Sequence, residues 1–323
     1  MSKRIFLFIV LMRALAAIVI TNAHYTGVYP TDLIANGGLL GDVLFFAVSG
    51  FCLANTNGKF GKWYLKRFVR VYIPSWLMTI IYMVLGAYVA TGAKDIFDFF
   101  IWPTHWHFVA SIIILYVPLF FVSKYIEMNR KNYWRIALGL FVLQMVLYLT
   151  VYDISYYHID KVREPMIEFL FFQSMLLGLH FRWRCNNEDA LSETISKKRI
   201  FFGGSILLLA IYFASKLIFV KYETVSAYQI LNQLVLWMLL YVLFQLFMGL
   251  ETKLKSIEGS KSWLCVKFIA DRTLEIYLVQ YVILDYLKIG PFPLNWLLLT
   301  TTILCSAVCL RWLSQQVIKR INL

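Results

Sequence analysis

The feature that most restricts the fold of this chain is a series of about ten apolar stretches, each long enough to cross a lipid bilayer. Short polar connections separate them, and no connection carries a soluble domain. A composition with 60% hydrophobic and 15% charged residues is typical of membrane proteins. We predict an all-α, polytopic membrane bundle in which residues 1–323 form one transmembrane domain. The predicted spans are residues 4–23, 39–56, 71–90, 107–123, 134–152, 165–182, 200–219, 227–248, 267–287 and 293–314.

The distribution of basic residues predicts how this bundle lies in the membrane. Most of the 31 Lys and Arg residues fall at the two ends of the chain and in every second connection. Basic loops stay on the cytoplasmic side, and an even number of spans places both termini there. We therefore predict a multi-pass protein of the cytoplasmic (inner) membrane. The net charge of +13 is assigned to contact with anionic membrane lipid, and nucleic acid is not expected as a partner.

The first predicted span holds two polar residues that an apolar helix does not need. Arg13 lies near its centre and His24 follows eleven positions later, so the two share one helix face, about 16 Å apart along the axis. An arginine inside a bilayer costs at least about 3 kcal/mol unless the protein compensates its charge. The predicted orientation places Arg13 at mid-membrane and His24 at the outer boundary. His24 is a candidate general base, with an interfacial histidine of no role as the alternative.

Two carboxylates are predicted at the same depths as these residues. Asp42, near the start of the second span, lies at the outer boundary and would hold one tautomer of the His24 imidazole. Glu275 lies near mid-membrane, at the depth of Arg13, with Tyr277 on the same span. A purely structural Arg13–Glu275 ion pair is the alternative. Both carboxylates stay open as partners of His24.

A basic cluster precedes the third predicted span. Lys62, Lys66 and Arg70 recur every four residues and share a helix face, with Arg67 beside them. We expect this span to begin after the cluster, with Pro74 in its opening turn. Bound phosphate would relieve the conflict between these cations and the helix dipole. Lys66, Arg67 and Arg70 are therefore candidate ligands of a nucleotide cofactor, with ordinary cytoplasmic-loop charge as the alternative.

The sequence contains no pattern typical of a metal site or of a disulfide framework. The five cysteines are scattered over apolar runs and one basic loop, and no His or Cys spacing fits a metal ion. His105 and His107 are two residues apart and do not share a helix face. Trp106 and His107 stand at the outer entrance of the fourth span, where they fit an interfacial belt or the lining of a site.

Several motifs, in order along the chain, resemble those of membrane acyltransferase family 3. They are Arg13 to His24 (R-x10-H), residues 45–51 (FF-x-x-SGF), residues 66–74 (R-x-x-R-I-x-P), residues 106–116 (the fourth-span motif) and residues 274–280 (I-Y-L-x-H). The resemblance covers nearly the whole chain. The sequence differs from the family pattern at Asp42. This acidic residue stands one position earlier than the acidic residue of the pattern, which rotates its carboxylate by about 100° around a helix. The sequence also differs at Gln280, which replaces a histidine.

The resemblance implies an enzyme that moves an acyl group, usually acetyl, from cytoplasmic acyl-CoA to a hydroxyl of a cell-surface or exported glycan. Arg13 and His24 would be essential, and Arg67 and Arg70 would serve the CoA side. Acetyl-CoA or another acyl-CoA is the expected co-substrate, without a metal. A glycan or lipid-linked glycan is the expected acceptor, and a homo-oligomer is left open. Since no esterase-like domain is appended, we expect the chain to complete the transfer alone or with a partner.

Our hypothesis from the sequence is therefore a membrane O-acyltransferase with His24 as general base or brief carrier of the acyl group. Asp42 would orient His24, and Arg13 would stabilise the thioester oxygen or a nearby carboxylate. The supporting or substrate-lining candidates are Trp106, His107, Glu275 and Tyr277. The rival hypothesis is a transporter or flippase of a glycan or lipid-linked precursor. Transporters commonly contain inverted repeats, and this sequence shows none. A structural membrane partner, the third hypothesis, leaves Arg13 and Glu275 unexplained.

Overall fold

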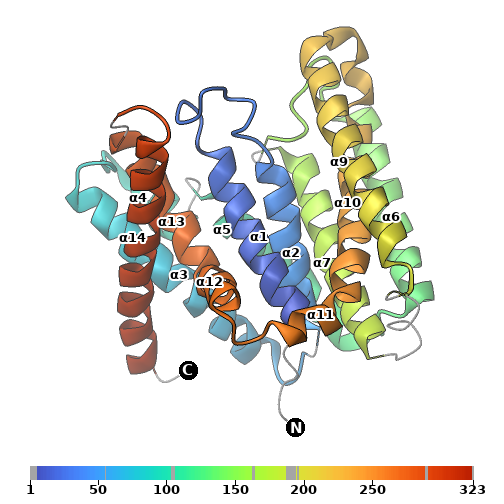
Figure 1. The fold of residues 1–323 in the computed structure, drawn as a ribbon, viewed down its shortest axis with the longest axis horizontal. Helices are drawn as coiled ribbons and strands as arrows, with labels where there is room; N and C mark the ends of the chain where they lie inside the picture. The colour runs from blue at the N-terminus through green and yellow to red at the C-terminus, as the bar shows by residue number, and fades with distance from the viewer. Residues whose placement is uncertain are drawn as a thin grey trace. The chain divides into compact units, whose positions relative to one another are not determined.

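The described part of the chain, seen in a computed structural model, consists of helices joined by turns and loops, without a β-strand, which confirms the all-α prediction. The structure describes residues 6–54, 56–102, 106–161, 164–186, 194, 196–287 and 290–321, so that His105 lies outside it. The helices are α1 (Leu7–Ala23), α2 (Gly38–Leu53), α3 (Phe60–Val84), α4 (Ala93–Ile96), the π-helix η1 (Phe97–Ile101), α5 (His107–Tyr125), α6 (Arg130–Thr150), α7 (Pro165–Cys185), α9 (Lys198–Lys221), the 3-10 helix η2 (Glu223–Tyr228), α10 (Ile230–Gly249), α11 (Glu251–Ser256), α12 (Lys261–Ala270), α13 (Thr273–Tyr286) and α14 (Leu294–Arg320) (Figure 1).

Five of these helices are long and apolar enough to cross a membrane, judged by length and composition. They are α5, α6, α9, α10 and α14. Each coincides with a predicted span, so these five predictions are confirmed as helices of spanning length. α1 and α2 are apolar but shorter, at 17 and 16 residues. The total of ten spans, the orientation in the membrane and the single domain stay predictions.

Two predicted spans have other boundaries in the structure. α3 already begins at Phe60, so the prediction that Pro74 lies in an opening turn was wrong: it lies inside the helix. Lysine and arginine are good helix formers, and the helix therefore extends through the basic cluster. The predicted span 267–287 is two helices, because α12 ends at Ala270 and α13 begins at Thr273. The Thr273 hydroxyl donates a hydrogen bond to the Ala270 carbonyl at 3.0 Å. This bond gives a partner to one of the carbonyl groups at the end of α12 that has none within the helix.

The chain divides into two compact units. Unit 1 comprises Met1–Met12, Val43–Thr56 and Pro118–Leu264. Unit 2 comprises Arg13–Asp42, Asn57–Val117 and Cys265–Leu323. α1, α2 and α5 therefore contribute residues to both units. All the candidate site residues named from the sequence belong to unit 2.

Unit 1 contains a very close crossing of α2 and α7. A Cβ atom added to Gly50 would overlap the carbonyl oxygen of Met175, and one added to Gly178 would overlap that of Ala47. Small residues of this kind let membrane helices approach to backbone contact. Gly50 belongs to the SGF motif, and this close helix crossing explains why the motif has a glycine at that position. α9 and α10 run side by side in the same unit (Figure 1).

The N-terminus of α1 is capped within unit 1 by a buried carboxylate. Glu251 of α11 accepts hydrogen bonds from the backbone N–H groups of Leu7 and Phe8, at 3.2 and 2.9 Å. These N–H groups have no partner inside their own helix, and a carboxylate also suits the positive end of the helix dipole.

Unit 2 is organised by α3, α13 and α14, which pack against one another. The Tyr82 hydroxyl of α3 donates to the Leu278 carbonyl of α13 at 2.6 Å. Gly41 brings the start of α2 close to α1, since a Cβ atom there would overlap the Ile20 side chain. The end of α1 and the start of α2 are thereby held together in the unit that also contains α13.

Candidate functional site

His24 follows the last residue of α1 and is half-buried. Its imidazole packs edge-on against the ring of Tyr281 in α13, with centroids 4.9 Å apart. Within the described part of the chain, its ring nitrogens form no hydrogen bond. Burial lowers the pKa of His24 below its ordinary value of 6.5, so the imidazole is neutral at neutral pH. A neutral imidazole with an uncommitted nitrogen has the properties of a general base.

Asp42 is buried in α2, with 8% of its surface exposed. It lies close enough to Tyr277 and Tyr281 to interact with both electrostatically. No hydrogen bond or ion pair joins Asp42 to His24 among the described residues. The sequence left open whether the two side chains meet. In the described structure they form no such bond, and the neighbour that they share is Tyr281.

Tyr281 was not among the residues singled out from the sequence. Its ring lies perpendicular to that of Tyr277, one helical turn earlier, with centroids 5.5 Å apart. Tyr277 also contacts the ring of Phe108, at 5.3 Å. A spacing of four residues places Tyr281 on the same helix face as Tyr277. This four-residue spacing, counted onward from Tyr277 of the motif at residues 274–280, is the sequence signal that could have identified Tyr281.

Gln280, at the position where the motif that residues 274–280 resemble ends in histidine, is fully buried in α13. Neither its amide oxygen nor its amide nitrogen forms a hydrogen bond of good geometry among the described residues, and its polar neighbour is Tyr281. A buried polar group without a partner costs about 1–3 kcal/mol. An amide in this state can accept from or donate to a substrate hydroxyl.

Glu275 is buried in α13 and faces three arginines. The nearest is Arg311 of α14, whose Nη1 lies 3.8 Å from the Glu275 carboxylate. Arg13 and Arg272 are close enough to act on the same charge. A structural Arg13–Glu275 ion pair was the alternative considered from the sequence. Among the described residues, the ion pair of Glu275 is with Arg311, which sequence spacing cannot reveal because the two residues lie on different helices. Three cations against one anion leave an excess of positive charge, which suits an anionic donor or a developing oxyanion.

The basic cluster lies inside α3, so the expected contribution of a helix N-terminus to anion binding there is absent. Arg67 stacks on the indole of Trp63, with its guanidinium carbon 4.3 Å from the ring centroid. It also donates to the Trp63 carbonyl at 2.9 Å. Lys66 is partly exposed and Arg70 is exposed. The cluster thus combines one oriented guanidinium with two cations that are at least partly exposed.

Trp106 and His107 mark the start of α5. Trp106 is 1% exposed and packs among Tyr82 and Tyr88, each at a centroid distance of 6.1 Å. The structure places it in an aromatic core. His107, the first residue of the helix, is partly exposed. Among the described residues, no cluster of His, Cys, Asp or Glu side chains is arranged to hold a metal ion.

A comparison with protein-family models decides the class of the protein. Residues 6–314 match the model of the acyltransferase domain, Acyl_transf_3. The chain belongs to membrane acyltransferase family 3. The resemblance seen in the motifs is thereby confirmed, and the protein is a membrane acyltransferase with several apolar helices. No curated protein and no solved structure matches this membrane acyltransferase.

Proposed function

We propose that this membrane acyltransferase moves an acetyl or other acyl group from cytoplasmic acyl-CoA to a hydroxyl of a cell-surface glycan or its lipid-linked precursor. The observation that carries the proposal is the state of His24. Its imidazole is neutral and half-buried, it is held by the ring of Tyr281, and its nitrogens are uncommitted within the described chain. Such a group can accept a proton from an acceptor hydroxyl.

In the proposed reaction, His24 removes the proton of the acceptor hydroxyl while its oxygen attacks the thioester carbonyl. The new C–O bond forms, the C–S bond breaks, and the proton passes from His24 to the leaving CoA thiolate. Asp42 stabilises the imidazolium that forms in between, from its buried position beside Tyr281. Arg13 stabilises negative charge on the thioester oxygen.

The donor is proposed to bind through its phosphates at Lys66, Arg67 and Arg70. Arg67 is the strongest of the three candidates because stacking on Trp63 already orients its guanidinium. A guanidinium that is oriented in advance loses less freedom when it binds a phosphate.

A cavity in unit 2 suits the acceptor. It has a volume of about 280 Å³ and lies among α1, α13 and α14. Its lining is mainly apolar. Tyr25 and Tyr29 contribute from the segment that follows His24, and Trp296 contributes from α14. The Tyr25 hydroxyl lies 2.8 Å from that of Thr300. An apolar lining with a few hydroxyl groups fits a lipid-linked sugar, whose chain is apolar and whose head is polar.

The test is a transfer assay on the purified protein in lipid nanodiscs, with acetyl-labelled acetyl-CoA and a glycan acceptor. We expect labelled glycan and one released CoA thiol per transfer, both reduced by at least about 100-fold in His24→Gln. Thiol release without labelled glycan would refute the glycan acceptor. Glycan movement across a vesicle bilayer without CoA turnover would instead support the transporter hypothesis.

A further inference from the structure

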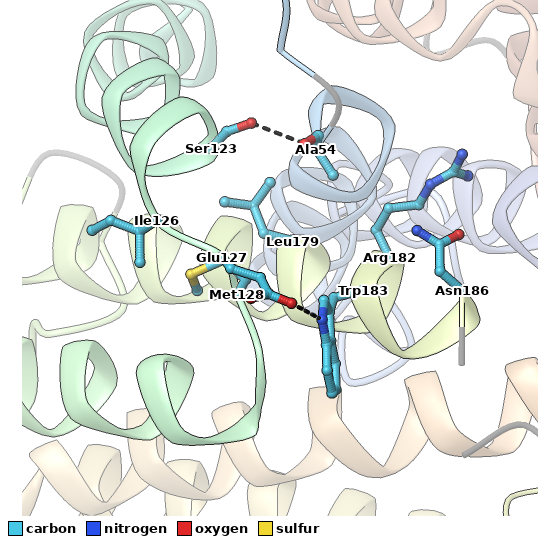
Figure 2. A pocket seen from close by; sticks show the side chains of 9 residues that line it. All are labelled: Ala54, Ser123, Ile126, Glu127, Met128, Leu179, Arg182, Trp183 and Asn186. Atoms are coloured by element: carbon cyan, nitrogen blue, oxygen red, sulfur yellow. Dashed lines mark hydrogen bonds between the residues drawn. The ribbon is translucent and has the colours of Figure 1, made fainter. Parts of the chain in front are cut away.

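A second cavity lies entirely within unit 1. It has a volume of about 210 Å³ and is formed by the end of α7 together with residues near the ends of α2 and α5 (Figure 2). Arg182, Trp183 and Asn186 contribute from α7 and the residue that follows it, and Ser123 contributes from α5. None of these residues has a role in the proposed acyl transfer, whose candidate residues all belong to unit 2.

Arg182 is the cation among the described residues that line this cavity, and it is partly exposed. Its guanidinium carbon lies 4.8 Å from the ring centroid of Phe6 and 5.2 Å from that of Phe51. It forms no hydrogen bond or ion pair with any residue in the described ranges. Contacts with rings use the face of a guanidinium and leave the N–H donors along its edge available.

Three other polar groups of the cavity, those of Glu127, Trp183 and Ser123, are already engaged. Glu127 accepts a hydrogen bond from the Trp183 indole N–H at 2.8 Å. The Ser123 hydroxyl lies within hydrogen-bond distance of the carbonyl oxygens of Leu53 and Ala54, at 3.2 and 3.1 Å, and Figure 2 draws the contact with Ala54. Among the described lining residues, the one carboxylate is that of Glu127, which is held by Trp183 and does not pair with Arg182. Arg182 and Asn186 are four residues apart at the end of α7 and so project from the same side of the helix, and Figure 2 draws both away from that bond.

We propose that this cavity binds a phosphate-bearing anion, with the guanidinium edge of Arg182 and the amide of Asn186 as its ligands. The planar fork of arginine matches two oxygens of a phosphate, and the neighbouring amide N–H₂ is a further donor. A volume of about 210 Å³ admits a phosphate and a small part of the group that carries it. The phosphate comes either from a soluble nucleotide or from the headgroup of an anionic lipid.

The experiment measures both sources separately. In the first arm, adenosine 3′,5′-bisphosphate is titrated calorimetrically into the full-length protein in nanodiscs of neutral phosphatidylcholine. In the second arm, phosphatidylglycerol retained by the protein is counted by native mass spectrometry. Wild type is compared with Arg182→Gln. The matched control is Arg184→Gln, which removes the same charge from the same helix but contacts Phe181, at 5.5 Å, and not the cavity.

We expect Arg182→Gln to weaken binding about tenfold or more in one arm, with Arg184→Gln close to wild type. Loss in the first arm identifies a nucleotide source, and loss in the second identifies a lipid. Asn186→Ala, at an exposed position, should weaken the same probe and replaces Arg182→Gln if that variant does not fold. Equal effects of the Arg182 and Arg184 variants, or no loss in either arm, would overturn the proposal.

Discussion

The imidazole of His24 and the phenol ring of Tyr281 meet at a centroid distance of 4.9 Å and an interplanar angle of 68°. This contact fixes the position of the candidate base by means of an aromatic ring, and within the described chain no hydrogen bond takes part. The ring shields the imidazole from water and leaves both of its nitrogens for a substrate. The same tyrosine lies beside the buried Asp42, and it is therefore next to both the candidate base and the carboxylate predicted to orient it.

The first prediction concerns the pH dependence of acyl transfer. Because burial lowers the pKa of His24, the rate should stay constant around pH 7 and fall on acidification with a midpoint below 6.5. Tyr281→Leu removes the shielding ring and should move this midpoint upward, toward 6.5. Tyr281→Phe keeps the ring and should leave it in place. The measurement is kcat/KM against pH, and a midpoint above 6.5 in wild type would contradict the role of His24.

The second prediction concerns the donor. Arg67→Gln should raise the KM for acyl-CoA about tenfold and change kcat much less, because it removes a contact made equally in the ground and transition states. Lys62→Gln, at an exposed position of the same helix, is the matched control and should change KM less than about twofold. Steady-state kinetics at fixed ionic strength distinguish the two. Equal effects of both substitutions would mean that general positive charge, and not the oriented Arg67, attracts the donor.

The third prediction concerns the stability of unit 2. Glu275→Gln leaves Arg311 and two neighbouring arginines without their carboxylate and should lower the free energy of unfolding by about 1–2 kcal/mol. The control is Asp271→Asn, because its 3.1 Å pair with Lys267 is exposed and should contribute less than about 0.5 kcal/mol. Denaturant titration in detergent micelles measures both. The double variant Glu275→Gln/Arg311→Gln should recover part of the loss, and no recovery would argue against their coupling.

The fourth prediction concerns the crossing of α2 and α7 in unit 1. Gly50→Ala places a methyl group against the Met175 backbone and should destabilise the protein by about 1–3 kcal/mol. Gly139→Ala in α6 meets nothing within 4 Å and should be neutral or stabilising by up to about 1 kcal/mol. Melting temperatures of the two variants provide the comparison. A Gly50→Ala protein as stable as wild type would show that the helices can separate at no cost.

Local pattern was a good guide to the long helices. The apolar runs that became α5, α6, α9, α10 and α14 were located from sequence because hydrophobic length is a property of contiguous residues. The same rule missed the early start of α3 at Phe60, since basic residues continue a helix as readily as apolar ones. The rule also missed the turn between Ala270 and Thr273, because residues 267–287 together form an apolar run long enough to be predicted as one span.

The sequence by itself determined the helical membrane class and, through its ordered motifs, the acyltransferase family. It also identified Arg13, His24 and Glu275 as unusual, because a charged or titratable side chain within an apolar run is visible without coordinates. Only the tertiary structure decided the partners: Tyr281 for His24, and Arg311 for Glu275. The reason is physical, since contacts between helices depend on how their faces are rotated and packed together, and spacing along one chain segment does not encode that rotation.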